Sequence, residues 1–541
     1  MGSIIKRFKP TLVSNFFPLI SLIILLSITI YTAIVTAYVY VNNSDALVAP
    51  FLFKTPLSTI NLLNVHSNIF KFPLFILQGI FPYHFGEFLL VNVLIAVLTV
   101  GLWLFLLIKL FGRKYIIVAS SIISLFLLSS TYFTESTFSM LTIRNIEFSI
   151  ALIFVYSIGY LFSKRLTKKY LLLNIIIWIL FSFIIAGDYY FIYVVSIPLL
   201  IMVLYETIIK NRFKKSDTYK LAIIITTVLA GLSIQKIFKI IGINFYKTPV
   251  FNNQVVSTNH LASSFTGATN SLLSITGSNI FGKSISLVNS IYFLSFILLV
   301  VSIIGFFLII KNNSSWFSEE NIPRSFVLRV YSLSFFLTFI VYFISGLSGQ
   351  SLREASYRYI AFMVFMAVFS LVFIMDAFYK KTSITYILPI VILLVTLFSF
   401  KHVISNYDYL YRDGLIQTRS NSSLVNYLEK KNIKSVVSDY WTSLPIKFYS
   451  NSRIIVSPVV GCKYAFPFNS SDSWYKPSGN GLYALIINNG QYSIVGCNKA
   501  SIISVYGQPI KKEQFVTYGH EYFIWIYKVD IIKKISLSSI Y

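Results

Sequence analysis

Eleven long runs of mostly apolar residues constrain the fold of this chain more than any other feature. A helix needs about 20 such residues to cross the hydrocarbon core of a bilayer. Only 12 % of the residues are charged, about half the share in an ordinary soluble protein. The sequence therefore predicts an α-helical polytopic membrane protein with eleven spans, at residues 16–41, 88–111, 115–133, 147–163, 170–187, 189–209, 221–242, 288–310, 328–346, 359–378 and 384–401.

Two features of these runs affect the count. The first run follows three basic residues, as in a signal peptide, but it exceeds the roughly 7–15-residue apolar core of one and shows no clear cleavage site. We expect a retained first helix. The fifth and sixth runs are separated only by Gly187-Asp188. Because a continuous helix of about 40 residues would measure about 60 Å, a hairpin is expected there.

Basic residues gather in alternate loops between the runs. With eleven spans, all these loops fall on one side, which the positive-inside rule identifies as the cytoplasm. We therefore expect a cytoplasmic N-terminus and an extracytoplasmic C-terminus. The net charge of +26 then reflects orientation rather than binding of nucleic acid. The loops contain Lys6, Arg7 and Lys9; Lys109, Arg113 and Lys114; Lys164, Arg165, Lys168 and Lys169; Lys210, Arg212, Lys214 and Lys215; Lys311, Arg324 and Arg329; Lys380 and Lys381.

Three long segments are expected on the outer side. Residues 1–401 form the transmembrane domain, with outer loops at 42–87 and 243–287, and residues 402–541 form an extracytoplasmic domain. The apolar stretch from Phe72 to Tyr83 is too short to span and predicts a re-entrant or interfacial helix. The second loop, rich in Ser, Thr, Asn and Gly, is too polar to span and predicts a water-facing surface.

The C-terminal segment has the pattern of a small α/β domain. Ser420-Asn421-Ser422 is typical of a helix N-cap and precedes an amphipathic helix. Cys462 and Cys497 are the only cysteines. A disulfide between them is expected on the oxidising side of the membrane, the alternative being two buried free thiols. Four strands are predicted, at Ile433–Val437, Arg453–Val456, Leu482–Ile487 and Tyr522–Val529.

Charged residues stand at the outer ends of several spans. Charge near a bilayer is costly unless it is paired or functional. Such a set suits a site that binds an anionic headgroup through Arg and uses a carboxylate as a base or metal ligand. The alternative for each residue is a solvated side chain at headgroup level, and Arg144 and Glu147 could simply pair with each other. The set comprises Asp45, Glu87, Glu135, Arg144, Glu147, Asp188, Arg353, Glu354 and Arg358.

Short motifs in the chain resemble those of a known family. Asp45 follows the first span, Lys71-Phe72-Pro73-Leu74 lies in the first outer loop, and Arg358-Tyr359 opens the tenth span. Ser438-Asp439-Tyr440-Trp441 lies in the outer domain. With the topology, these motifs resemble the GT-C superfamily of membrane glycosyltransferases. The chain looks most like the bacterial relatives of protein mannosyltransferases and of the aminoarabinose transferase.

The resemblance implies an inverting transfer of a sugar from a polyprenyl-phosphate carrier to a glycan, lipid or protein acceptor on the outer face. Asp45 would be the catalytic base, and Arg353 or Arg358 would neutralise the phosphate. The family often has Asp-Glu in the first loop, whereas Ala46 follows Asp45 here, so a second acid would come from elsewhere. Whether the reaction needs a divalent metal is left open. The residues expected to bind substrate are Arg353, Arg358, Tyr359, Asp188, Glu135, Arg144 and Lys71, and Tyr357 and Trp441 are aromatic residues that could stack on a sugar.

Two other functions are compatible with the sequence. One is a lipid or polysaccharide transporter or flippase, and the other is a non-catalytic assembly protein of the cell envelope. The sequence has no Walker A motif and no GxGxxG, so a nucleotide-driven transporter is unsupported. Ion-coupled transporters place acidic residues at mid-membrane, whereas the only mid-span charges here are Lys236 and Lys239.

Overall fold

The computed structural model describes residues 10–53, 60–64, 85–138, 145–160, 168–209, 215–240, 245–246, 255–311, 322–345, 357–379, 384–466, 470–476, 481–488 and 497–537. Within these parts, every predicted span coincides with a helix. These helices are α1 (Pro10–Tyr40), α4 (Phe85–Phe111), α5 (Ile116–Ser129), α7 (Ile146–Tyr160), α8 (Lys168–Gly187), α9 (Ile197–Ile209), α10 (Lys215–Ile240), α12 (Ser290–Lys311), α13 (Ile322–Ile344), α15 (Ala361–Tyr379) and α16 (Ile384–Lys430).

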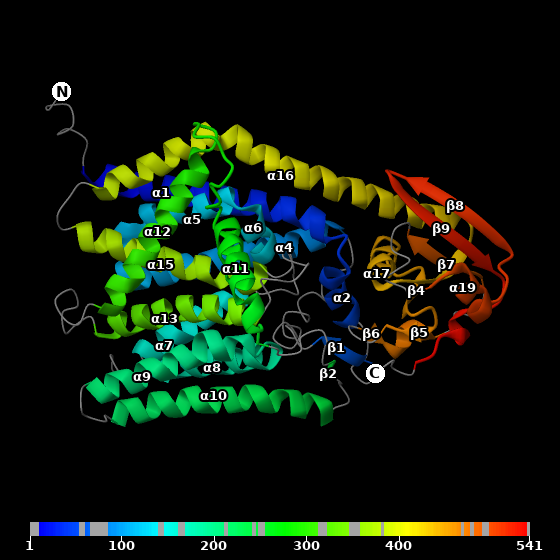
Figure 1. Cartoon of the computed structure of the whole chain (residues 1–541), viewed down its shortest axis with the longest axis horizontal. Coiled ribbons are helices and arrows are strands. Elements are labelled where there is room, and N and C mark those ends of the chain that lie inside the picture. Colours follow the sequence, from blue (N-terminus) through cyan, green and yellow to red (C-terminus); the bar gives the residue numbers. More distant parts are fainter. Residues whose placement is uncertain are drawn as a thin grey trace.

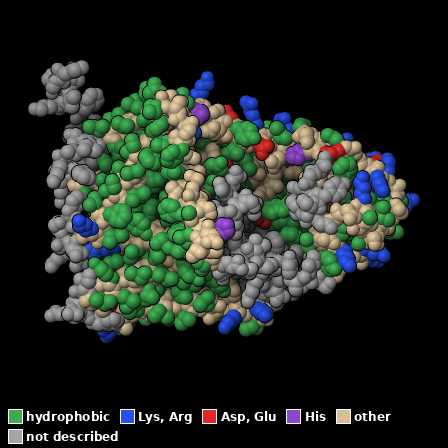
Figure 2. All heavy atoms as spheres, viewed as in Figure 1, with side chains coloured by type: hydrophobic (Ala, Val, Ile, Leu, Met, Phe, Trp, Pro, Cys, Tyr) green, Lys and Arg blue, Asp and Glu red, His purple; other side chains and the backbone are tan. Residues whose placement is uncertain are grey.

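The helices form one bundle with the C-terminal sheet at one end (Figure 1). Seven of the described helices are long and apolar enough to cross a membrane, and one bent pair makes an eighth. The remaining predicted spans are shorter apolar helices, at Ile146–Tyr160, Ile192–Ile208 and Ala361–Ala377. Hydrophobic side chains cover the bundle, and Lys and Arg lie at its borders and over the C-terminal end (Figure 2). The chain is therefore an integral membrane protein, as the sequence predicts.

The third span is bent, and the straight helix predicted over 115–133 is wrong at its end. The helix α5 stops at Ser129, and α6 (Thr131–Phe138) continues at an angle of 101°. Ser130 lies between them with an extended backbone. Its hydroxyl donates to the carbonyl of Ser274 at 2.9 Å and accepts from the amide of Phe133 at 3.1 Å. A serine that bonds the backbone in this way favours a helix start over a helix interior.

The fifth and sixth spans separate where the sequence predicts a turn. The chain leaves α8 at Gly187, turns at Asp188, and re-enters a helix through one π-helical turn at Ile192–Ser196 before α9. Both α8 and α9 pack against α10, as two separate spans do. At Gly231 of α10, an added Cβ would lie 2.7 Å from the side chain of Ile185, so α8 and α10 are in close backbone contact.

The helix α16 is one continuous helix of 47 residues, about 70 Å long. It crosses the predicted boundary at residue 402 without a break (Figure 1). The helix start predicted at residues 420–422 is wrong. The Ser420 hydroxyl lies 3.2 Å from that of Tyr522, and the Asn421 amide donates to Asn42 Oδ1 at 2.9 Å. Because these side chains bond to other parts of the molecule, they do not cap a new helix.

The C-terminal domain contains a six-stranded sheet in the order β5-β4-β3-β7-β9-β8. The strand β3 pairs in parallel with β4 and β7, and the other pairs are antiparallel. All four predicted strands are present, although β4 and β9 are displaced along the chain. The polar edge strand β8 and the pair β5 and β6 are not predicted. The strands are β3 (Ile433–Ser438), β4 (Ile455–Val460), β5 (Tyr464–Ala465), β6 (Ser470–Ser471), β7 (Leu482–Asn488), β8 (Lys511–Thr517) and β9 (His520–Tyr527).

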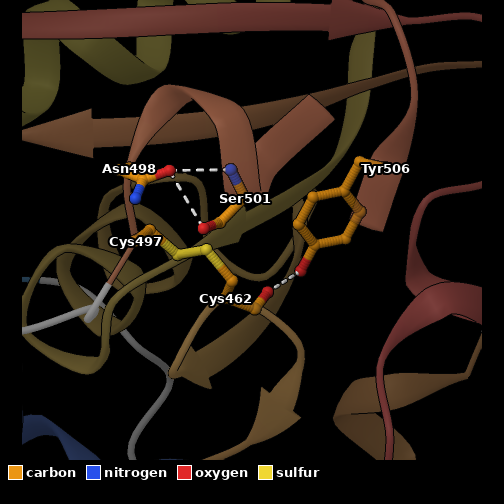
Figure 3. The surroundings of a disulfide bond; sticks show 5 residues. All are labelled: Cys462, Cys497, Asn498, Ser501 and Tyr506. Atoms are coloured by element: carbon orange, nitrogen blue, oxygen red, sulfur yellow. Dashed lines mark hydrogen bonds between the residues drawn. A yellow bond between two sulfur atoms is a disulfide. The ribbon is translucent and has the colours of Figure 1, made fainter. Parts of the chain in front are cut away.

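The structure joins Cys462 and Cys497 in a disulfide, with their Cα atoms 5.2 Å apart (Figure 3). The bond links the turn after β4 to the start of helix α19 (Lys499–Tyr506). Asn498 caps that helix by accepting a hydrogen bond from the Ser501 amide at 2.8 Å. The hydroxyl of Tyr506 donates to the carbonyl of Cys462. Both ends of α19 are thus tied to the residues after β4.

The three predicted outer segments meet in a small sheet. Its order is β2-β1-β6, with β1 at Ile60–Asn64 and β2 at Phe245–Tyr246. The first loop, the second loop and the C-terminal domain each supply one strand. The second loop also contains α11 (Leu261–Ile275), which runs across the direction of the bundle and packs against α13 and α6 (Figure 1). The predicted re-entrant helix at 72–83 lies outside the described residues.

The opposite end of the bundle holds a cluster of ions. Asp376 near the end of α15 accepts from Arg324 on α13 and from the Tyr115 hydroxyl, and Lys114 lies 3.8 Å away. Arg324 also lies over the ring of Phe111, 4.5 Å from its centroid. The contacts join four spans at the end where the sequence predicts the basic loops.

Candidate active site

Asp45 stands at the start of a short helix that the sequence pattern does not predict. The helix α2 (Ser44–Phe53) follows α1 after three residues. Asn43 forms the turn, because its Oδ1 accepts from the Asp45 amide at 2.9 Å and its carbonyl accepts from the Ala46 amide at 3.0 Å. An acidic residue in a first turn is favoured by the helix dipole. The local sequence therefore fixes the carboxylate at the end of the bundle next to the C-terminal domain.

The C-terminal domain contacts this carboxylate directly. Tyr440 opens α17 (Tyr440–Tyr449), and its hydroxyl donates to Asp45 Oδ1 at 3.0 Å. The hydroxyl of Ser44 donates to the carbonyl of Tyr440 at 2.8 Å. The helix α17 itself begins with Asp439 as N-cap, which accepts from the Thr442 amide at 3.0 Å. Two consecutive residues of the first loop are thus bonded to one residue of the last domain.

A second set of bonds holds the loop against α16 and α17. The Asn42 amide donates to the carbonyl of Gly414 at 3.1 Å. Its Oδ1 accepts from Asn421 at 2.9 Å and from the Tyr449 hydroxyl at 3.0 Å. Because one side chain bonds groups of both helices, the position of α2 depends on the C-terminal part of the chain.

Arg358 is the described cation whose charge favours the ionised form of Asp45. It lies in a short 3-10 turn, η8 (Tyr357–Tyr359), before α15. Burial raises the pKa of Asp45, and the hydrogen bond from Tyr440 and the charge of Arg358 oppose that shift. The guanidinium lies over the ring of Tyr359, 5.2 Å from its centroid. Its Nε is buried and has no hydrogen-bond partner among the described residues, so within the described part of the chain it is a donor available to an anion.

Two further predicted acids are carried by elements that pack on η8. Glu135 lies on α6, which packs against η8, and the rings of Tyr132 and Tyr357 are 4.9 Å apart. Asp188 accepts from the amide of Tyr190 at 3.0 Å. The hydroxyl of Tyr190 in turn donates to the carbonyl of Tyr359. Three predicted acids are thus linked to the turn that carries Arg358: Asp45 by the charge of Arg358, Glu135 by the packing of α6, and Asp188 through Tyr190.

The remaining predicted residues either lie outside the described part of the chain or have another role. Lys71, Arg144, Arg353 and Glu354 lie outside the described residues. Glu147 is buried and accepts from the Asn145 amide at 2.9 Å, which is the helix-start role that its position at α7 favours. Among the residues that the structure describes, no group of three or more His, Cys, Asp or Glu side chains could hold a metal ion.

Pattern reasoning misses two residues of the same interface. Tyr440 is found in the sequence only through its Ser-Asp-Tyr-Trp motif, which gives no hint of its contact with Asp45. Lys447 has no signal at all. Its Nζ lies over the rings of Phe51 at 4.9 Å and Trp474 at 4.2 Å, and burial lowers its pKa to about 7.

The fold has counterparts among solved structures. ArnT from Cupriavidus metallidurans bound to undecaprenyl phosphate matches with a TM-score of 0.51 at 10 % identity, over 93 % of this chain and 97 % of that chain. The apo state of the same protein matches with a TM-score of 0.38 at 11 % identity, over 94 % of this chain and 98 % of that chain. No protein-family model and no curated protein matches the sequence. The chain has an ArnT-like fold, which confirms the helical membrane bundle with a small C-terminal α/β domain expected from the sequence.

Proposed function

We propose that the protein is a membrane glycosyltransferase that moves a sugar from a polyprenyl-phosphate carrier to an acceptor hydroxyl on the outer face. The observation that carries this proposal is the placement of Asp45 and Arg358 within electrostatic reach of each other, at the end of an ArnT-like bundle that adjoins the C-terminal domain. A carboxylate can remove a proton, and a guanidinium with an N–H that has no described partner can neutralise an anionic leaving group. Together the two groups suit a reaction that needs both steps.

The leaving group is the carrier phosphate. As the bond between sugar C1 and the phosphate oxygen breaks, the oxygen keeps the electron pair and the phosphate gains a negative charge. The guanidinium of Arg358 can bond two oxygens of such a group and neutralise that charge. The buried Nε of Arg358 without a described partner is a donor of the required kind. Undecaprenyl phosphate, the ligand of the matching ArnT structure, is the product that such a step would leave.

The nucleophile is the acceptor hydroxyl. It forms the new bond to C1 on the face opposite the phosphate, which inverts the sugar configuration, and its proton passes to a base. Asp45 is the base in this scheme, since this half-buried residue is held by the Tyr440 hydroxyl and lies within reach of the charge of Arg358. Glu135 and Asp188 stand beside the same turn and would bind the sugar or the acceptor.

The test is transfer by the purified protein in vesicles. Undecaprenyl phosphate carrying a radiolabelled sugar is supplied from a set of hexose and pentose donors, with envelope lipid and glycan fractions as acceptors. The wild type should release undecaprenyl phosphate and label an acceptor. Asp45→Asn should reduce kcat by at least about 10²-fold without changing the melting temperature by more than a few degrees.

Asp413→Asn is the matched control, because Asp413 is an exposed acid on α16 that accepts a hydrogen bond from Gln417 at 2.9 Å. It should keep wild-type turnover. Full activity of Asp45→Asn would exclude Asp45 as the base. Carriage of the intact donor across the vesicle membrane without cleavage would show a flippase instead, and inertness towards every donor would favour an assembly protein.

A further inference from the structure

One face of α17 covers α2. Tyr440 and Lys447 are seven residues apart, so they project from the same face of α17, two turns from each other. Tyr440 reaches Asp45 near the start of α2, and Lys447 lies over Phe51 near its end. The two helices are in contact along much of their length. The C-terminal domain therefore meets the first loop at the residue assigned as the base.

The hydroxyl of Tyr440 is held in a fixed place. Its side chain is fully buried, and its ring stacks on Phe466 with centroids 4.3 Å apart and planes 12° apart. Its backbone carbonyl accepts from the Ser44 hydroxyl at 2.8 Å. A donor fixed at both ring and backbone favours the orientation of the carboxylate in which Oδ1 faces this hydroxyl.

We propose that Tyr440 is a positioning residue of the active site: its hydroxyl holds Asp45 Oδ1, so that Oδ2 faces the acceptor and the carboxylate stays ionised. This role rests on the proposed function, in which Asp45 removes the proton of the acceptor. It makes the C-terminal domain a part of the active site, since no residue of the transmembrane bundle supplies this hydrogen bond among those described.

The charge balance around Asp45 explains why such a donor is needed. Burial favours the protonated carboxylic acid and raises the pKa of Asp45. Two described groups oppose that shift, the hydroxyl of Tyr440 on α17 and the guanidinium of Arg358 on η8. Lys447 faces the same helix further along, against Phe51. Without the hydroxyl, the carboxylate would stay protonated to a higher pH. Its side chain would also be free to change rotamer.

The experiment compares two tyrosines of α17. Tyr440→Phe removes the hydroxyl bonded to Asp45 and keeps the ring on Phe466. Tyr449→Phe removes a hydroxyl that bonds the same loop at Asn42, at an equal 3.0 Å, without touching the acid. Each variant loses one hydrogen bond between the first loop and the C-terminal domain. Any weaker packing of the loop against that domain is therefore common to both variants.

Two measurements are made on the full-length protein in vesicles. The pH–rate profile should show the acid limb of Tyr440→Phe about one pH unit higher, with kcat reduced on the order of tenfold and KM little changed. The pH dependence of labelling by a hydrophobic carbodiimide, read at Asp45 by peptide mass spectrometry, should shift by the same amount. Tyr449→Phe should move neither.

The labelling does not depend on turnover, so it separates the two proposals. If no donor is turned over but the labelling midpoint shifts in Tyr440→Phe alone, the proposed reaction fails and the role of Tyr440 in ionising Asp45 stands. If the two variants show the same midpoint as the wild type, or shift equally, Tyr440 has no specific role in positioning the carboxylate.

Discussion

Gly414 on α16 packs directly against the backbone of Tyr38 on α1. A Cβ at position 414 would lie 2.5 Å from the Tyr38 carbonyl oxygen, closer than real contacts allow. The first and last helices of the bundle therefore touch at a point where only glycine fits. The Gly414 carbonyl, in turn, accepts the hydrogen bond from Asn42 that places the loop before Asp45.

Substitution of this glycine should loosen the bundle next to the site. We expect Gly414→Ala to lower the free energy of unfolding by about 1–3 kcal/mol, because the helices must move apart. The measurement is the melting temperature of the detergent-solubilised protein. Gly101→Ala is the control, since the same methyl on α4 would meet nothing within 4 Å and alanine favours a helix. Equal melting temperatures for both variants would contradict the close contact.

Arg358 should respond to substitution as a phosphate ligand does. We expect Arg358→Gln to reduce kcat/KM by about 10²–10³-fold, because the developing charge on the phosphate loses its counter-ion. Arg358→Lys should restore part of the activity, since it keeps the charge and loses the paired donors. The measurement is initial-rate kinetics with the active donor. Arg412→Gln, at an exposed position of α16, should be neutral, and a neutral Arg358→Gln would remove this residue from the site.

The disulfide should stabilise the C-terminal domain. Cys462 and Cys497 are 35 residues apart. A cross-link that closes a loop of this length lowers the conformational entropy of the unfolded chain and raises its free energy by about 4 kcal/mol. Reduction of the full-length protein should therefore lower the temperature at which proteolysis begins within residues 431–537. The double variant Cys462→Ser with Cys497→Ser should show the lower temperature and no further response to reductant. If reductant still lowered the proteolysis temperature of the double variant, the effect of reductant would not come from this disulfide.

Lys447 should make stability depend on pH. Burial lowers its pKa from 10.5 to about 7, so between these values the unfolded chain binds more protons than the folded one. Stability then rises with pH across that window, and the full cost of burial is present below pH 7. We expect Lys447→Met to raise the melting temperature by several degrees at pH 6 and by less as pH approaches 10. Lys512→Met is the control, because Lys512 lies 4.3 Å from the centroid of the Trp525 ring on an exposed strand.

Hydropathy was sufficient to predict the membrane-spanning helices, but not where each of them ends. The predicted span runs past Ser130, where the chain bends because the Ser130 hydroxyl bonds the carbonyl of the distant Ser274 and the amide of Phe133. In the same way, the sequence around Ser420 is typical of a helix start, but the Ser420 hydroxyl bonds that of Tyr522 and α16 continues. In both cases a contact between residues far apart in the chain decides a local structure, and no local pattern contains that information.

The residues of the candidate site at the ends of spans were predictable from the sequence, but their partners in the C-terminal domain were not. Asp45 and Arg358 could be selected because each stands at the end of a span on the predicted outer side, and the structure places them within electrostatic reach. Tyr440 could not, because its role depends on how α17 packs on α2. The partners supplied by the sheet domain are therefore the part of the site that requires a structure.

The contact between α2 and α17 also has a consequence for biosynthesis. Asp45 and Tyr440 are separated by 395 positions, and a ribosome that adds about 5–20 residues per second needs roughly 20–80 s to make that stretch. Throughout that time, the first loop has emerged without the helix that will cover it. If Tyr440 positions Asp45 as we propose, a nascent chain gains its activity only after its last domain has folded against the first loop, and a chain truncated after α16 should insert into the membrane without transferring sugar.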